Sequence, residues 1–543
     1  MRTSHCARIL LIAFAVLPAR TLAQHEQDHT HAAPEKLGRV DFPTSCKPEV
    51  QPTFTRGMAL LHSFAYVEAS RAFSETATKD PSCAMAQWGI AMSNFHPIWG
   101  PSTEDEFAAG RTAAQKAAAM ATQNARERDY IAAIGAFYQG EGLPHPARVV
   151  AFEKGMSLVA RQNPGDREAE IIHALAILGV AYNSPPDKTY ARQKQAAEIL
   201  NRLLPLEPDH PGIAHYMIHS FDYPEIAGLA LPAARAYAKI APSAPHALHM
   251  PSHIFTRLGM WQESIASNLA SAETAQAWIS GTHPGATAFD ALHAMDYLEY
   301  AYLQTGQDDK ARKVAEDAAR VTSLNVPAFS AGFALAAIPA RYALERRAWK
   351  EAAALTVQSA AFPWEKYPYA EANVHFARTL GAARAGDLGA AREALAKLTE
   401  LETALRGRKG FDWATQVEIQ RRTAAAWLAR AEHRDDEAVV VMRSAAELED
   451  SSDKHPVTPG SILPAREQLA DLLTELGKPA EALAEYEASL RSAPARFNSY
   501  LGAARAAEDA GQGQKAKAYR DQLIALCGGA VPARTILTKA TAE

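Results

Sequence analysis

The chain has 543 residues but only four cysteines, and no two of them form a Cys-x-x-Cys pair. This scarcity excludes a disulfide-dense scaffold and a zinc ribbon. Glycine and proline, 30 and 32 residues, are too few for a fibrous or low-complexity protein. Lysine and arginine (56) do not outnumber aspartate and glutamate (61), so we expect no nucleic-acid partner. Beyond the N-terminal segment no apolar run approaches about 18 residues, and we expect no membrane anchor.

Several motifs and one periodicity are also missing. The sequence contains neither the G-x-S-x-G turn of serine hydrolases nor the G-x-x-x-x-G-K-[ST] phosphate loop. β-Branched residues do not alternate with polar residues over any sustained run, which argues against a sheet. Hydrophobic residues make up 48% and charged residues 22%, the balance typical of a folded soluble protein. Composition alone does not indicate a reaction.

The first 23 residues differ from all that follow. Arg2 and Arg8 precede an apolar run over residues 9–17, and residues 21–23 offer a cleavage site before Gln24. This pattern is typical of a signal peptide. The sequence therefore predicts a periplasmic or secreted protein.

If the chain is exported, the three remaining cysteines can form a disulfide, because disulfides persist in an oxidising compartment. Cys46 and Cys83 flank a segment about as long as one helix pair. A bond between them would fix the N-terminal arm to the body of the protein; the alternative is two buried thiols. Cys527 has no obvious partner, and we expect it to be buried rather than reactive.

Internal repetition is the strongest signal in the sequence, with a period of about 34 residues. A glycine that ends one helix is followed by the start of a second helix that packs back on the first. This pattern predicts an all-α, right-handed helical solenoid of about 11–12 helix pairs. It recurs at residues 258–266, 305–311, 384–391 and 476–483. The predicted organisation is a signal peptide (1–23), a flexible His-rich N-terminal arm (24–49), the solenoid (50–528) and a C-terminal tail (529–543).

The repeats resemble tetratricopeptide repeats (TPRs) over nearly the whole mature chain. Three phrases, at residues 82–93, 246–255 and 454–467, are similar to a group of exported bacterial tetratricopeptide repeat proteins of unsettled activity. The resemblance implies the fold and export, and it supplies no catalytic residues. Tetratricopeptide domains in general bind peptides and proteins in a concave groove, so it also implies a binding scaffold.

Histidines gather in one part of the chain: eight of the 19 lie between residues 210 and 293. His215 and His219 are four residues apart, as are His249 and His253, and such pairs share one helix face. Two histidines at this spacing can hold one metal ion. By the resemblance, this face of the first helix lines the groove. The residues that the repeat register places there are His173, His215, His219, His246, His249, His253, His293 and Asp296.

Clustered imidazoles need acceptors or a cation to satisfy their nitrogens and to limit mutual protonation. Copper, iron and zinc all suit such a ligand set. A polar ligand-binding groove and an incidental polar seam are the alternatives. The predicted ligands are His215, His219, His249 and His253, then His246 and His293, with Asp296 as a ligand or an orienting partner.

Two weaker groups lie elsewhere in the sequence. The stretch 447–467 is unusually rich in proline and charge for a helix junction. A capped helix entry with ion pairs is favoured there over a loop that reaches the groove. Near the N-terminal end, His62 and the turn at residues 96–99 are candidates to add polar groups to the groove. The favoured interpretation of this turn is a corner in which Trp99 is packed.

Two hypotheses of function follow from these observations. In the first, an exported TPR solenoid binds a peptide, a protein or a small ligand in its His-lined concave groove, with or without a bound transition metal. In the second, the chain is a copper-, iron- or zinc-dependent enzyme whose active site lies in the groove of residues 173–296. The hypotheses differ in whether the imidazoles converge within metal–nitrogen distance of one point, about 2.0–2.2 Å.

Overall fold

The computed structural model describes residues 35–99, 101–120, 122–140, 142–358, 362–408, 410–529 and 534. Within these residues the fold is all-helical, as predicted, and the one β contact is an isolated bridge between Thr287 and Leu324. The predicted signal peptide and nearly all of the predicted C-terminal tail lie outside the described residues. Among the described helices, none is long and apolar enough to cross a membrane.

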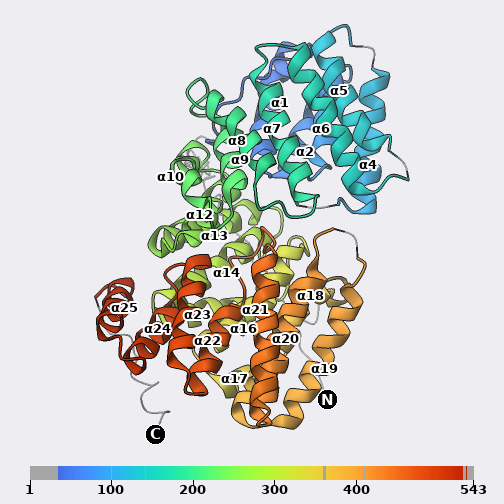
Figure 1. Ribbon diagram of the computed structural model, residues 1–543. Coiled ribbons are helices and arrows are strands. Elements are labelled where there is room, and N and C mark those ends of the chain that lie inside the picture. Colours follow the sequence, from blue (N-terminus) through green and yellow to red (C-terminus); the bar gives the residue numbers. More distant parts are fainter. Residues whose placement is uncertain are drawn as a thin grey trace, which may run out of the picture. The chain divides into compact units, whose positions relative to one another are not determined.

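Consecutive helices pack on each other in pairs (Figure 1). The described residues form 25 α-helices, and because α11 and α12 together make one member of a pair, they give twelve pairs. First helices of successive pairs also contact each other, as α14, α16, α18 and α20 do in turn. The helices are α1 (Gln51–His62), α2 (Tyr66–Lys79), α3 (Ala84–Ser93), α4 (Glu104–Ala119), α5 (Ala125–Tyr138), α6 (His145–Gln162), α7 (Arg167–Tyr182), α8 (Ala191–Leu203), α9 (Pro211–Phe221), α10 (Leu231–Ile240), α11 (Pro245–His249), α12 (Pro251–Arg257), α13 (Trp261–Ile279), α14 (Phe289–Gln304), α15 (Asp308–Ala319), α16 (Phe329–Glu345), α17 (Trp349–Ala353), α18 (Pro368–Ala385), α19 (Leu388–Leu405), α20 (Trp413–Ala431), α21 (Asp435–Ser451), α22 (Ala465–Glu475), α23 (Pro479–Ser492), α24 (Phe497–Asp509) and α25 (Gly513–Leu526), with 3₁₀ helices at Pro48–Val50, Ala227–Ala230 and Trp364–Lys366.

The turn within several pairs requires a left-handed backbone conformation. Gly259, Gly306 and Gly477 follow the first helices α12, α14 and α22, with φ angles of +67°, +68° and +70°. Glycine adopts this conformation without a steric penalty, which explains why the repeat is visible in the sequence at these turns. Arg347 and His433 occupy the same place after α16 and α20, with φ of 56° and 61°.

Residues 36–47 pack against the helices, although we expected them to belong to a flexible arm over residues 24–49. Phe42 is 1% exposed, and its ring lies 5.1 Å from Tyr130 and 5.6 Å from Trp88. A disulfide joins Cys46 to Cys83 at the start of α3. The apolar side chains of this segment lie in the core, which fixes the segment; residues 24–34 lie outside the described part of the chain.

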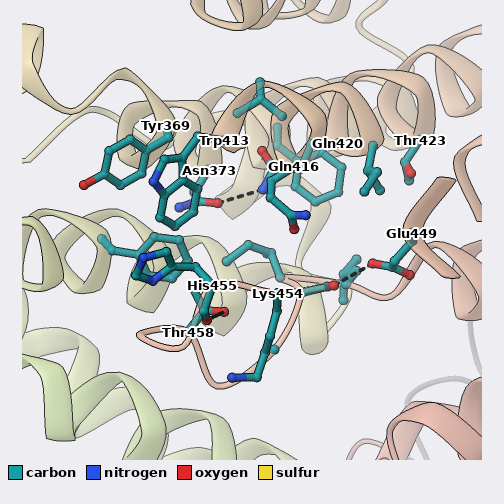
Figure 2. Close-up of a pocket in the computed structure, with 18 residues that line it drawn as sticks. Tyr369, Asn373, Trp413, Gln416, Gln420, Thr423, Glu449, Lys454, His455 and Thr458 are labelled. Atoms are coloured by element: carbon teal, nitrogen blue, oxygen red, sulfur yellow. Dashed lines mark hydrogen bonds between the residues drawn. The ribbon is translucent and has the colours of Figure 1, made fainter. Parts of the chain in front are cut away.

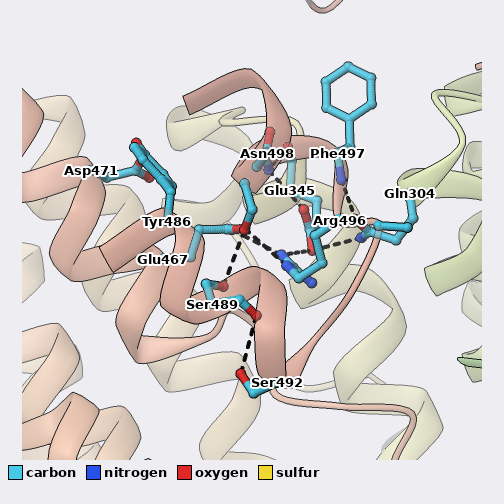
Figure 3. Close-up of polar contacts among 12 residues, drawn as sticks. Gln304, Glu345, Glu467, Asp471, Tyr486, Ser489, Ser492, Arg496, Phe497 and Asn498 are labelled. Atoms are coloured by element: carbon cyan, nitrogen blue, oxygen red, sulfur yellow. Dashed lines mark hydrogen bonds and ion pairs between the residues drawn. The ribbon is translucent and has the colours of Figure 1, made fainter. Parts of the chain in front are cut away.

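A buried ionic network connects the last repeats with the middle of the chain (Figure 3). Arg496, directly before α24, is fully buried and donates to Glu345 of α16 at 2.7 Å and to Glu467 of α22 at 2.9 Å. Its third partner is the hydroxyl of Tyr300 on α14, also at 2.7 Å. Two neighbouring helices from the middle of the chain (α14 and α16) and two from its end (α22 and α24) therefore meet at one guanidinium.

Candidate metal centre

The six histidines predicted as metal ligands form two groups of three. His215 and His219 on α9 meet His246 on α11, and we call this group the first triad. The second triad consists of His249 at the end of α11, His253 on α12 and His293 on α14. In each triad one ring nitrogen per histidine lies within 4.8 Å of the other two. The sequence predicted one set of histidine ligands in the groove, whereas the structure divides these histidines into two adjacent sets.

The joint between α11 and α12 brings the triads together. Met250 has helical angles (φ −53°, ψ −35°), so the chain continues in helical geometry across Pro251, which begins α12. His249 and His253 therefore keep the four-residue spacing of one helix face. His246 lies one turn earlier on α11, and its ring centroid is 6.3 Å from that of His249. The stretch 246–249 thus belongs to a short helix.

Hydrogen bonds fix the proton positions in the second triad. His249 Nδ1 lies 2.7 Å from the side-chain oxygen of Asn268, whose amide nitrogen donates to the carbonyl of Ser264 at 2.8 Å. His253 Nδ1 lies 3.0 Å from a carboxylate oxygen of Asp222. Because both oxygens only accept, each Nδ1 must carry the proton, and each Nε2 of the neutral rings presents a lone pair.

Those two lone pairs face each other. The Nε2 atoms of His249 and His253 are 3.1 Å apart, and neither neutral ring can donate to the other. Two nitrogens on one metal ion with bonds of about 2.0–2.1 Å at tetrahedral angles lie about 3.3 Å apart. The observed separation therefore matches a pair of metal ligands closely. The ring of His293 completes this set, with its centroid 4.2 Å from that of His249.

The first triad has a similar arrangement. His215 Nδ1 donates to the backbone carbonyl of His62 at 2.6 Å, which leaves a lone pair on Nε2. This Nε2 lies 3.1 Å from Nε2 of His219 and 3.2 Å from Nε2 of His246. The Nδ1 atom of His219 is buried and has no hydrogen-bond partner among the described residues.

Burial keeps both triads in the form that binds metals. No imidazole of the six is more than 9% exposed. Burial first, and neighbouring imidazoles second, hold the pKa values of His249 and His293 well below the ordinary value. Neutral imidazole is the form that ligates transition metals, so the rings need not lose a proton to bind an ion.

Asp222 carries the charge that supports the second triad. Burial opposes its ionisation, but Lys454, Arg257 and His253 hold the pKa of this carboxyl well below its usual range. Arg257 donates to it at 2.8 Å, and the Lys454 ammonium lies 3.6 Å away. A carboxylate that accepts from a ligand histidine orients the ring and raises its basicity.

The stretch 447–467 contributes to the same site. Besides Lys454, the backbone of this stretch accepts from Tyr297 of α14, whose hydroxyl lies 3.0 Å from the carbonyl oxygen of Thr458. The Tyr297 ring lies 4.8 Å from that of His249. The stretch also holds the ion pairs expected of a helix entry, such as Arg466 with Asp450. Both interpretations of this stretch therefore apply.

Two of the predicted groove residues lie outside the triads. His173 on α7 contacts Glu153 at 3.2 Å and is not among the converging imidazoles. Asp296 accepts from the buried Arg341 at 2.5 Å, and it belongs to neither group of candidate ligands. A fully buried guanidinium requires an anionic partner, and Asp296 is that partner for Arg341.

Sequence reasoning missed several residues that support the centre. His62, Glu168 and His210 form another group, outside both triads. Glu168 lies 2.5 Å from His62 Nε2 and 3.0 Å from His210 Nε2, so hydrogen bonds satisfy these atoms without a metal ion. Asp222 and Asn268 were missed because they lie on other elements at no fixed spacing from their histidines. Only the position of Asp222 directly after α9 gave any signal.

An aromatic cavity opens beside the first triad. It measures about 240 Å³, and its lining includes Trp99 and Tyr182. The ring centroid of Trp99 lies 5.5 Å from that of His246, and that of Tyr182 lies 6.1 Å from that of His219. The far wall is a stack in which the Trp413 ring lies 4.1 Å from Tyr369 and 4.9 Å from His455. Figure 2 shows these three side chains side by side, in a close-up of a neighbouring pocket that they also line.

No protein-family model matches this chain, and no curated protein matches it. Among solved structures, the chain is similar to a human IFIT1 dimer with m7Gppp-AAAA, at 13% identity over 82% of this chain and 90% of that chain, with a TM-score of 0.38. It is also similar to the P58(IPK) TPR domain (12% identity, 86% and 99% covered, TM-score 0.21). A third is the APC/C hetero-tetramer Cut9–Hcn1 (10% identity, 90% of each chain covered, TM-score 0.31).

At such identities and TM-scores, no ligand or site of these proteins transfers to this chain. The fold is a stack of helix pairs, the architecture of TPR-like solenoids, and such folds present scaffolds for protein or ligand binding. Fold and site together define the class: an all-helical repeat protein with two buried histidine triads.

Proposed function

We propose that this chain is a metal-dependent enzyme, with a transition-metal ion held by the second triad. The observation that carries the proposal is the pair of lone pairs on His249 and His253, 3.1 Å apart with both Nδ1 protons donated elsewhere. Without a cation, this contact places two acceptors against each other in a buried site. An ion between them converts the repulsion into two coordinate bonds.

The enzyme hypothesis is favoured over a purely structural metal because the ligand set is incomplete. Structural zinc sites close the coordination shell with four protein ligands, whereas catalytic sites use three and keep one position open. The second triad supplies three. The aromatic cavity beside the first triad suits a small aromatic or apolar molecule, since its volume of about 240 Å³ lies just below the range of drug-sized pockets.

We also propose that the protein acts outside the cytoplasm. The disulfide between Cys46 and Cys83 supports this, since such bonds persist in oxidising compartments. The signal peptide predicted for residues 1–23 would direct the chain there.

The test is metal analysis of the mature chain, purified without chelator and reconstituted in parallel with copper, zinc and iron. We expect stoichiometric metal in the parent and loss of at least one equivalent in His249→Ala/His253→Ala, with unchanged helical circular dichroism. His173→Ala is the matched control, because this histidine lies outside both triads, and it should retain the full metal content. Absence of stoichiometric metal from the parent with all three ions would refute the proposal.

A further inference from the structure

We propose that the centre is dinuclear, and that the first triad binds a second ion next to the one held by the second triad. This inference rests on the proposed function. It places the second ion next to Trp99 and Tyr182, two residues that line the aromatic cavity.

The hydrogen-bonding capacity of the first triad is the first argument. His215 Nε2 has one lone pair, since its Nδ1 proton is donated to the His62 carbonyl, yet two other Nε2 atoms lie at 3.1 and 3.2 Å from it. One lone pair cannot accept well from both. A metal ion at the meeting point of the three nitrogens uses all three lone pairs.

The second argument is the way the first triad is enclosed. The ring of Phe64 lies 4.3 Å from that of His215, 5.6 Å from His219 and 5.7 Å from His246. Phe64 has a φ of 54°, the left-handed angle of the turn within a helix pair, here the turn between α1 and α2. The Phe64 ring covers one side of the first triad. The Trp99 ring contacts His246 and also lines the aromatic cavity.

The third argument is the short distance between the triads. His246 and His249 belong to the same five-residue helix α11, one to each triad, and their ring centroids are 6.3 Å apart. Rings of two ligand sets this close place their ions side by side. A small molecule or a solvent oxygen between the ions could then contact both.

The ligand chemistry indicates copper ahead of the other ions. Among the described residues, neither triad includes a carboxylate. Imidazole-only sites suit copper and zinc, and copper(II) binds more tightly than zinc at a given nitrogen site. Six neutral ligands leave the ionic charge uncompensated, and a pair of copper(I) ions carries half the charge of two dications, so it is less costly to bury.

The experiment counts ions. The apo chain is loaded with copper(I) under anaerobic conditions and in parallel with zinc, and bound metal is measured after gel filtration. We expect two equivalents in the parent and in His173→Leu, one in His219→Leu, one in His253→Leu, and none in His219→Leu/His253→Leu. Tighter retention of copper than of zinc against a chelator is expected in the parent.

The outcomes separate this inference from the proposed function. One equivalent in the parent, unchanged in His219→Leu, would overturn the dinuclear centre and leave a mononuclear enzyme. No metal in the parent would remove both proposals. If His219→Leu loses its helical circular dichroism, His246→Gln takes its place, because His246 is the most exposed ligand of the first triad at 9%. It is also expected to reduce the count to one.

Discussion

At the scale of residues, the proposed metal centre depends on three hydrogen-bond acceptors outside the proposed ligand sets. The carbonyl of His62, the amide of Asn268 and the carboxylate of Asp222 each accept an Nδ1 proton. Each contact fixes one ring in the tautomer that directs Nε2 inward, and it also fixes the ring's rotation. Such partners affect a metal site nearly as strongly as its ligands do.

Replacing Asp222 with asparagine tests this support. We expect Asp222→Asn to lower metal affinity about 10- to 100-fold, because His253 loses the anionic acceptor of its Nδ1 proton. The measurement is competition with a chelator on folded protein. Asp209→Asn, an exposed aspartate near α9, serves as control and should leave affinity unchanged. Equal affinities for both variants would show that the carboxylate does not support a metal site.

The two histidine pairs could be predicted from sequence because their spacing is that of one helix face. The four-residue intervals in α9 and across the α11–α12 joint are local, and they were enough to identify both pairs. Partners on other elements have no such interval, so Asp222 and Asn268 could not be found. Register placed His173 on the expected helix face, but it did not show that Glu153 is its neighbour there.

At the scale of elements, residues 36–47 act as a strap across the first repeats. The backbone of Arg39 donates to the carbonyl of Asp209 at 3.0 Å, and that of Ser243 donates to Lys36 at 3.1 Å. The disulfide between Cys46 and Cys83 anchors the end of this strap. The strap therefore connects α1 and α3 with the loops that flank α9 and α10.

Removal of the disulfide should destabilise the protein measurably. The bond spans 37 residues, and closing a loop of this length in the unfolded chain is worth up to about 4 kcal/mol in the chain-entropy account. We expect Cys46→Ser/Cys83→Ser to lower the urea midpoint accordingly. Cys527→Ser is the control, since Cys527 is a free thiol, and its midpoint should match the parent's. A midpoint unchanged in the double variant would contradict a stabilising role.

The helix pairs could be predicted where glycine marks the turn, as it does at Gly259, Gly306 and Gly477. The turns at Arg347 and His433 adopt the same left-handed angles with side chains that give no such signal. The packing of the strap was missed because its few apolar residues, such as Phe42, are buried in a core that helices distant in sequence form.

At the scale of the whole molecule, contacts between distant repeats supplement the stacking of neighbours. Arg496 joins helices whose sequence positions differ by up to 196 residues, and the Trp261 indole donates to the carbonyl of Ala495 at 2.8 Å. A simple repeat array has only nearest-neighbour interfaces. The added contacts predict that the middle and last repeats unfold together.

Replacement of Arg496 should expose this coupling. Arg496→Met leaves Glu345 and Glu467 buried without their cation, and breaking a buried pair on one side costs about 3–5 kcal/mol. We expect a clear fall in the urea midpoint. Arg520→Met breaks an exposed pair with Glu508, where 46% of the arginine side chain is accessible, and should cost no more than about 1 kcal/mol. Similar urea midpoints for both variants would argue that the buried ionic network does not couple the middle repeats to the last ones.

The approach of Lys454 to Asp222 sets an order of events in biosynthesis. A ribosome releases the chain from its N-terminus, so all six imidazoles emerge before the stretch that carries Lys454 and Thr458. Until that stretch arrives, Asp222 lacks its buried ammonium and the Tyr297 hydroxyl lacks its carbonyl acceptor. In a nascent chain the two histidine triads therefore lack these contacts, which only the finished chain supplies.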